Sequence, residues 1–242
     1  MLFYLNYLIE SVMEQTMLTE KHKKILNDIP LFEGLSRNIK ASFPDRIDYV
    51  LYNIEKNDVI ARQNTPCKSL YILVEGRLRV DIIDGWGNNV LIEDIIAPRA
   101  FATPHLFSKD NTLPATFTVT VKGVLLKATK ESVFKLISEE PALLKNFLCV
   151  TGNCNQCTVA RLHALTQKSV RNRIIVYLLE KKHADRDWVM ADHNNSQLAD
   201  YLCVTCPALS KEINKMAKEG LIAIEGKKIY LLGINKLKRA VL

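Results

Sequence analysis

The chain has no apolar run long enough to cross a membrane. Its hydrophobic start, MLFYLNYLI, is far shorter than the roughly 20 residues that span a bilayer. It also lacks the basic segment and the small-residue cleavage site of a signal peptide. We therefore expect a cytoplasmic protein whose six cysteines are reduced thiols and not a disulfide framework. We expect residues 1–20 to be an N-terminal extension, with Met13 and Met17 as alternative start positions.

The sequence also lacks the residue patterns of common catalytic sites. Its five histidines are scattered, without an HxxxH spacing or a triad-like companion. It contains no glycine-rich phosphate loop and no paired-carboxylate site. We expect no enzymatic activity, no bound metal and no cofactor.

Positive charge is concentrated in the C-terminal third of the chain. With 242 residues, of which 48% are hydrophobic, the chain can bury one or two cores. Residues 1–165 contain 19 Lys and Arg against 18 Asp and Glu, whereas residues 166–242 contain 14 Lys and Arg against 8 Asp and Glu. Most of the net charge of +7 therefore lies where a nucleic-acid partner would require it.

Short apolar runs broken by turn residues extend from Ile47 to Ala128. Within one of them, Leu78, Val80 and Ile82 alternate with polar residues, which is typical of a half-buried strand. Many short strands at near-regular spacing favour a β-barrel or jelly roll over a parallel sheet. The predicted strands cover residues 49–54, 58–62, 69–74, 77–83, 90–96, 116–121 and 124–128. Short helices are predicted at 21–27 and at 130–137, and a further short helix is predicted to end near Pro44.

A long helix is predicted from Pro141 to about Leu165. Its residues at 4-3-4-3-4-3 spacing form an a/d seam, which favours dimerisation. The candidate interface consists of Leu144, Leu148, Thr151, Asn155, Thr158 and Leu162. Asn155 either fixes the register of a coiled coil or contacts an effector in the barrel. An ordinary core helix is the alternative, because three heptads are few.

The stretch from Ser196 to Ile222 has the pattern of a helix-turn-helix. Cys203 and Val204 interrupt a helical spacing of apolar residues that comprises Leu198, Leu202, Leu209, Ile213 and Met216. Thr205 is a good N-cap, and Pro207 falls in the first turn, where its missing N–H costs least. The second helix is therefore predicted to start at about Cys206.

The outer face of this second helix is small, polar and basic. At 100° per residue, Lys211, Asn214 and Lys218 lie opposite the apolar stripe. In a major groove, Lys reaches guanine O6 or N7, and Asn pairs with adenine. A solvated amphipathic helix is the alternative. The candidate DNA-contacting residues are Ser196, Thr205, Pro207, Ser210, Lys211, Asn214, Lys215, Lys218, Lys227 and Lys228.

The flanking segments fit a winged form of this motif. A helix over 170–182, capped by Ser169, precedes it. Two strands, 221–224 and 228–232, follow and are joined by Glu225-Gly226-Lys227, so that a basic wing tip would face phosphate. A last helix is predicted from about Asn235.

The order of these elements resembles the CRP/FNR family of bacterial transcription regulators over residues 20 to 242. The segments that carry the resemblance are Tyr71–Val80 (YILVEGRLRV), Ser196–Lys218 and Glu219-Gly220-Leu221-Ile222. It implies an α+β chain with an N-terminal double-stranded β-helix (a jelly-roll barrel like those that bind cyclic nucleotides) over 21–140. A dimerisation helix over 141–166 and a winged helix-turn-helix over 167–242 would follow. It further implies a homodimer on a palindromic operator that contacts RNA polymerase.

The sequence departs from the family at the cyclic-nucleotide cassette. Where the family carries Gly-Glu for the ribose and Arg-Ser/Thr-Ala for the phosphate, this chain has Ala102-Thr103 and Leu113-Pro114-Ala115. A buried phosphate would lack its charge partner, so cyclic AMP is not expected to bind. Two interpretations of this segment remain: it binds a small apolar effector, or it is a loop with only a structural role. The candidate pocket residues are Arg99, Phe101, Thr103, His105, Leu106, Phe107, Pro114, Ala115, Asn155 and Thr158.

The cysteines leave another interpretation open. Cys154-x-x-Cys157 and Cys203-x-x-Cys206 have a spacing that suits zinc or a redox switch. The N-terminal cysteine group of the family's iron–sulfur members is absent, and packing as small apolar residues is the simpler interpretation. Cys206 lies where relatives often place a guanine-reading Arg, so specificity would rest on Lys211 and Asn214. A cysteine-based sensor, or a protein-interaction module without specific DNA binding, are the alternatives.

Overall fold

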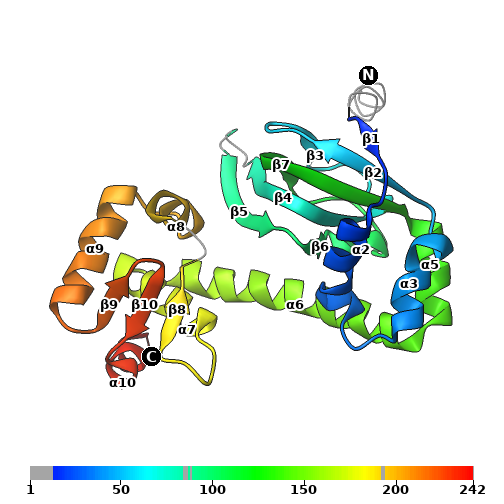
Figure 1. Cartoon of the computed structure of the whole chain (residues 1–242). Helices are drawn as coiled ribbons and strands as arrows, with labels where there is room; N and C mark the ends of the chain where they lie inside the picture. The colour runs from blue at the N-terminus through cyan, green and yellow to red at the C-terminus, as the bar shows by residue number, and fades with distance from the viewer. Residues whose placement is uncertain (1–12, 84–86, 88, 192–193, 242) are drawn as a thin grey trace. The chain divides into compact units, whose positions relative to one another are not determined.

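The computed structural model describes residues 13–83, 87, 89–191 and 194–241, and for residues 155–157 and 160 only the backbone. The chain divides into two compact units, residues 1–154 and 155–242, here called the sheet unit and the winged-helix unit (Figure 1). Over the described residues, no helix is long and apolar enough to cross a membrane.

The sheet unit is built on a seven-stranded antiparallel sheet. Five strands pair in the order β1-β2-β7-β4-β5, while β3 pairs with β7 and β6 pairs with β4. Over the described residues the sheet is jelly-roll-like, as predicted, although it does not close into a barrel. The strands are β1 (Gln15–Thr16), β2 (Tyr49–Ile54), β3 (Val59–Ala61), β4 (Ser69–Ile83), β5 (Asn89–Ile96), β6 (Arg99–Phe101) and β7 (Thr116–Thr129).

Two of these strands are each longer than the sequence pattern predicted. The breaks expected at residues 75–76 and 122–123 are not strand ends, because β4 and β7 continue through them and pair along their length with shifts in register. Gly76 has φ 101°, and a Cβ on it would lie 2.6 Å from the carbonyl oxygen of Val121. A Cβ on Gly123 would overlap the backbone of Glu75. The two glycines therefore permit β4 and β7 to cross at close range. In the sequence pattern the same glycines indicated two turns.

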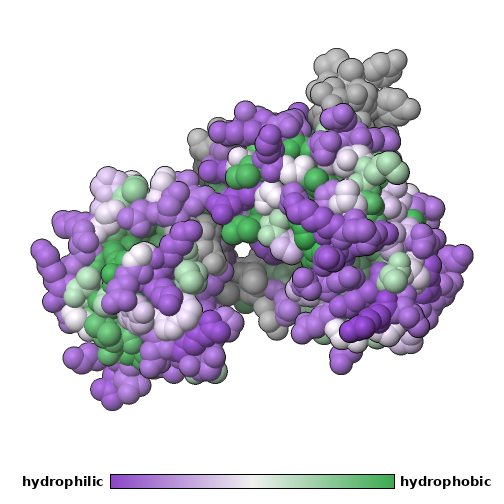
Figure 2. All heavy atoms as spheres, in the orientation of Figure 1, coloured by the Kyte–Doolittle hydropathy of each residue, from purple (hydrophilic) through white to green (hydrophobic). Residues whose placement is uncertain are grey.

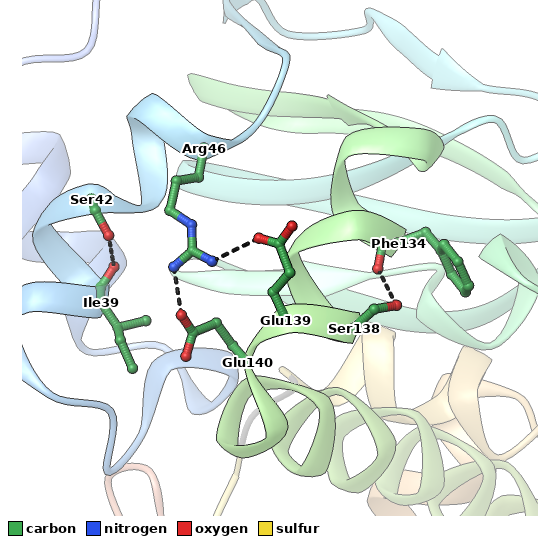
Figure 3. A network of polar contacts seen from close by, with 7 residues as sticks. All are labelled: Ile39, Ser42, Arg46, Phe134, Ser138, Glu139 and Glu140. Atoms are coloured by element: carbon green, nitrogen blue, oxygen red, sulfur yellow. Dashed lines mark hydrogen bonds and ion pairs between the residues drawn. The ribbon is translucent and has the colours of Figure 1, made fainter.

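Short helices cover this sheet. They are α2 (Glu20–Asn27), the 3-10 helix η1 (Pro30–Phe32), α3 (Arg37–Arg46), α4 (Thr103–Leu106) and α5 (Lys130–Glu139). Arg46 at the end of α3 donates to Glu139 at 3.0 Å and to Glu140 at 2.6 Å (Figure 3). These ion pairs connect α3 to the junction where α5 ends and α6 (Pro141–Thr166) begins.

The winged-helix unit has the predicted helices and one additional strand. Its elements are the end of α6, α7 (Val170–Lys181), β8 (Trp188–Met190), α8 (Asn195–Tyr201), α9 (Cys206–Lys218), β9 (Ile222–Glu225), β10 (Lys228–Leu231) and α10 (Ile234–Val241). Three strands pair in the order β8-β10-β9. β8 was not predicted, because the three apolar residues after Asp187 show no alternating pattern. A separate core, which includes Ile175, Leu202 and Leu209, holds these elements together.

Candidate nucleic-acid interface

Helix α9 turns its apolar side inward and its basic side outward. Leu209 and Met216 have no exposed surface, and Ile213 is also buried. Pro207, Lys211, Asn214, Lys215 and Lys218 are all exposed. Figure 1 shows α9 on the outer side of the unit, and β9 contacts it. The predicted face is therefore present and accessible, while its role in reading bases stays a prediction.

Both α8 and α9 are capped at their N-termini by residues of the types that favour this position. The hydroxyl of Thr205 accepts a hydrogen bond from the backbone N–H of Ala208 at 3.4 Å. The amide oxygen of Asn194 accepts from Gln197 N–H at 2.9 Å, and the Gln197 side chain accepts from Asn194 N–H at 3.0 Å. Ser196 is exposed in the first turn of α8, and Ser210 is partly exposed on α9.

The turn between α8 and α9 is held by backbone hydrogen bonds and by one arginine. Val204 N–H donates to the carbonyl oxygen of Ala199 at 2.9 Å. Cys203 has φ 51°, a left-handed conformation that few non-glycine residues adopt. Arg173 on α7 donates from Nη1 to the carbonyl oxygens of Leu202 at 2.9 Å and Cys203 at 3.2 Å. These bonds satisfy carbonyls that the end of α8 leaves without partners.

A second arginine connects α7 directly to α9. Arg171 donates from Nε to Glu212 at 2.5 Å, and from Nη1 and Nη2 to Glu219 at 2.8 and 2.9 Å. The two carboxylates raise the pKa of the Arg171 guanidinium above its ordinary value. The hydrogen bond from Arg171 in turn lowers the pKa of Glu219. Arg171 and Glu219 are therefore both charged at neutral pH.

A third arginine comes from the end of α6. Arg161 is 8% exposed, donates from Nε to the carbonyl oxygen of Tyr201 at 3.2 Å, and lies 4.7 Å from the centre of the Tyr201 ring. The sequence analysis did not single out Arg161, Arg171 or Arg173. For Arg171 and Arg173 the only signal was the net positive charge of residues 166–242, whereas Arg161 lies in the part of the sequence whose charges nearly balance.

The wing has an exposed basic tip. Gly226 has φ 60°, which permits the tight turn between β9 and β10. Lys227 is exposed beside it. Lys228 is only partly exposed, and its ammonium lies 4.8 Å from the centre of the Trp188 ring. Lys228 therefore has an aromatic partner within the wing, which its charge alone did not predict.

The predicted effector residues are mostly packed into the core of the sheet unit. Phe101, Thr103, Leu106 and Ala115 are at most 5% exposed. The Phe101 ring stacks on Tyr71 at 5.3 Å and lies 5.2 Å from Phe117. Side chains of the sheet therefore occupy the space around Phe101.

The other members of that set in the sheet unit have separate surroundings. Phe107 packs edge-on against Phe134 and Phe147. Arg99 is paired with Glu93 at 3.0 Å, and Pro114 is exposed. Burial lowers the pKa of His105. Thr158 is exposed, and the side chain of Asn155 lies outside the described residues, so its predicted register or effector contact is not assigned.

The predicted seam of α6 presents leucines at the surface of the single chain. Leu144, Leu148 and Leu162 are 38%, 60% and 62% exposed. Thr151 is partly buried, whereas Leu143 and Phe147 turn into the core. The face of the molecule drawn in Figure 2 is mostly hydrophilic, with scattered hydrophobic areas. The leucines that the heptad spacing selects are therefore exposed in the single chain.

Several cysteines are exposed, whereas packing as small apolar residues would bury them. Cys149, Cys203 and Cys206 are exposed, while Cys67 is buried and its burial raises the pKa of its thiol. The packing interpretation of the CxxC cysteines is therefore wrong for Cys203 and Cys206. Among the residues that the structure describes, no group of three or more His, Cys, Asp or Glu side chains is arranged to hold a metal ion.

Two family models match the chain, one for each unit. Residues 52–140 match the cyclic nucleotide-binding domain, and residues 172–240 match the Crp-like helix-turn-helix domain. The probable transcriptional regulator flp of Lacticaseibacillus casei is 23% identical over 223 residues, which cover 87% of this chain and 94% of that relative.

Solved structures share the fold at low sequence identity. A CooA mutant from Carboxydothermus hydrogenoformans has a TM-score of 0.66 at 16% identity, covering 88% of this chain and 100% of that one. FixK2 from Bradyrhizobium japonicum has a TM-score of 0.60 at 15% identity, covering 80% and 97%. The global regulator CLP from Xanthomonas campestris, described as responsive to cyclic di-GMP, has a TM-score of 0.58 at 15% identity, covering 82% and 100%.

A cyclic-nucleotide-binding-type sheet unit followed by a winged helix-turn-helix defines a DNA-binding transcription regulator, which is not an enzyme class. The chain belongs to the CRP/FNR family of these regulators.

Proposed function

We propose that this regulator binds, as a homodimer, a two-fold symmetric operator whose half-sites lie about one helical turn apart. The exposed basic face of α9 carries the proposal. Lys211 and Asn214 project from the side of α9 opposite Leu209, where a major groove would lie. In this arrangement Lys211 contacts guanine, Asn214 contacts adenine, and Lys227 at the wing tip contacts phosphate.

The exposed leucines of α6 support the dimer. Leu148 and Leu162 are 60% and 62% exposed in the single chain, and a second helix packed on them would remove this apolar surface from water. A two-fold axis along paired α6 helices would present two copies of α9 to successive major grooves. RNA polymerase is the further partner that activation or repression would involve, and its contact surface is not assigned to particular residues.

We further propose that the sheet unit does not bind cyclic AMP. At the cassette positions Ala102, Thr103, Leu113 and Ala115 are all buried, and none of them can neutralise a phosphate. Arg99, the nearest arginine, is already paired with Glu93. Calorimetry with cyclic AMP and with cyclic di-GMP tests this, and saturable binding of cyclic AMP would contradict it.

The experiment that tests the DNA-binding proposal has two stages. Bound sites are first selected from random duplexes, and affinity is then measured on the selected and on a scrambled duplex over a series of salt concentrations. Lys211→Ala and Asn214→Ala should each weaken the selected duplex by about 1–3 kcal/mol more than the scrambled one. Equal affinity for all duplexes would overturn the proposal.

Two further variants complete this experiment. Lys227→Ala should weaken both duplexes alike, and the slope of log affinity against log salt should become shallower by about 0.9 for each lost phosphate contact. Lys56→Ala removes the same charge from an exposed position of the sheet unit and should change neither quantity. If Lys211→Glu combined with Lys215→Glu left DNA affinity unchanged, a protein-interaction module would be favoured instead.

A further inference from the structure

A single side chain of α7 binds two carboxylates, one from α9 and one from its C-cap residue, Glu219. Arg171 meets Glu212 through Nε and Glu219 through both terminal nitrogens, so that three of its nitrogen atoms donate. The side chains of Arg171, Glu212 and Glu219 are 26%, 21% and 39% exposed. Partial burial and paired geometry distinguish this cluster from an isolated surface ion pair, which contributes little.

The spacing of the two carboxylates determines what such a contact constrains. Glu212 and Glu219 are seven residues apart, or about 10.5 Å along the axis of α9. Both lie on the flank of the helix, between the buried stripe and Lys215. Because one guanidinium contacts both, a rotation of α9 about its axis or a shift along it would break at least one pair. Apolar packing of Leu209 and Met216 is less directional.

The same contact changes the charge that α9 presents to a phosphate backbone. Lys211, Lys215 and Lys218 lie within one or three residues of Glu212 and Glu219. Without Arg171 the two carboxylates would oppose the approach of phosphate and would offer these lysines partners within the protein. With Arg171 in place, the lysines on the outer face remain available.

We propose that Arg171 is a positioning residue for sequence reading, which holds α9 at the rotation and axial position that place Lys211 and Asn214 against bases. The inference rests on the proposed function. It assigns to Arg171 no contact with DNA. It predicts that loss of the forked geometry reduces discrimination between duplexes more than it reduces affinity for DNA in general.

The test compares Arg171→Lys and Arg171→Gln with the wild-type protein on the selected and scrambled duplexes. Arg171→Lys keeps the charge but not the fork that reaches two carboxylates. It should lower the ratio of selected to scrambled affinity by about tenfold, the size of one lost base contact, with an unchanged salt slope. Arg62→Gln, an exposed arginine of the sheet unit, is the matched control and should leave the ratio unchanged.

Other outcomes are distinguishable. An unchanged ratio in Arg171→Lys would overturn the inference, and so would an equal loss on both duplexes with a shallower salt slope, which indicates a direct phosphate contact. Arg171→Gln can also be combined with Glu212→Gln and Glu219→Gln. If this triple variant had the full ratio of selected to scrambled affinity, Arg171 would only compensate the charge of the two carboxylates, which would contradict its role as a positioning residue. If thermal melting shows that Arg171→Gln does not fold, Glu212→Gln and Glu219→Gln test one pair at a time, and each should lower the ratio. A wild-type protein without any preferred duplex would instead refute the proposed function itself.

Discussion

Nη1 of Arg173 lies 2.9 Å from the carbonyl oxygen of Leu202, and this bond joins α7 to the turn between α8 and α9. Leu202 is fully buried, so its carbonyl has little access to water. We expect Arg173→Met to lower the free energy of unfolding by about 1.5–3 kcal/mol, the range for a hydrogen bond to a charged group. Denaturation by urea measures this loss. Arg239→Met, which changes an exposed arginine of α10, should have little effect.

The seam of α6 should determine the oligomeric state. Leu148→Glu and Leu162→Glu place a charge where the proposed partner helix would pack, so each should shift the protein from dimer to monomer. Light scattering after size-exclusion chromatography measures the mass directly. Ile83→Glu alters an apolar side chain that is 53% exposed on β4 and should leave the mass unchanged. A dimer that persists in both seam variants would contradict the assignment.

Thiol reactivity should follow burial. A maleimide should label Cys149, Cys203 and Cys206 in the folded protein, whereas Cys67 should react only after unfolding, because its thiol is buried and its pKa is raised. Peptide mapping by mass spectrometry identifies the labelled positions. An adduct on Cys206, the first residue of α9, should block DNA binding by its bulk. Cys206→Ser should relieve that block, and relief by Cys149→Ser instead would place the sensitive thiol in α6.

The pair between Arg171 and Glu219 should make stability depend on pH in a defined direction. Because the pKa of Glu219 in the folded protein lies below its ordinary value of 4.5, the pair contributes above that value and is lost as pH falls through the lowered pKa. Glu219→Gln should therefore lower the melting temperature more at about pH 7 than at about pH 3. Glu33→Gln, at an exposed position, is the control. Equal effects at both pH values would argue against this ion pair.

The crossing of β4 and β7 should tolerate no side chain at Gly123. A Cβ there would overlap the backbone of Glu75, so Gly123→Ala should cost about 3 kcal/mol, the upper end for overpacking. Gly233→Ala is a control, since its added Cβ would meet side-chain atoms no closer than 3.5 Å. Chemical denaturation followed by circular dichroism compares the two. A similar loss in both variants would show that the close approach at Gly123 is not what limits substitution.

Local sequence patterns were sufficient wherever a local rule determines the structure. The start of α9 was predicted at Cys206 and observed there, because the Thr205 hydroxyl and Pro207 act within one turn. The Ser169 cap of α7 and the start of α6 at Pro141 follow from the same short-range rules. The inward and outward faces of α9 required only a period of 3.6 residues.

Tertiary structure decided the features that depend on partners far apart in the chain. Arg171 meets carboxylates 41 and 48 residues away, and no spacing in the sequence pairs them. Gly76 and Gly123 resemble two turns until β4 and β7 are placed side by side, where they permit one close crossing. The sequence by itself therefore determined which residues form α9 and which of its sides is basic. Only the packing of α7 against α9 decided how that helix is held, because three charged groups must converge in space before they can form ion pairs.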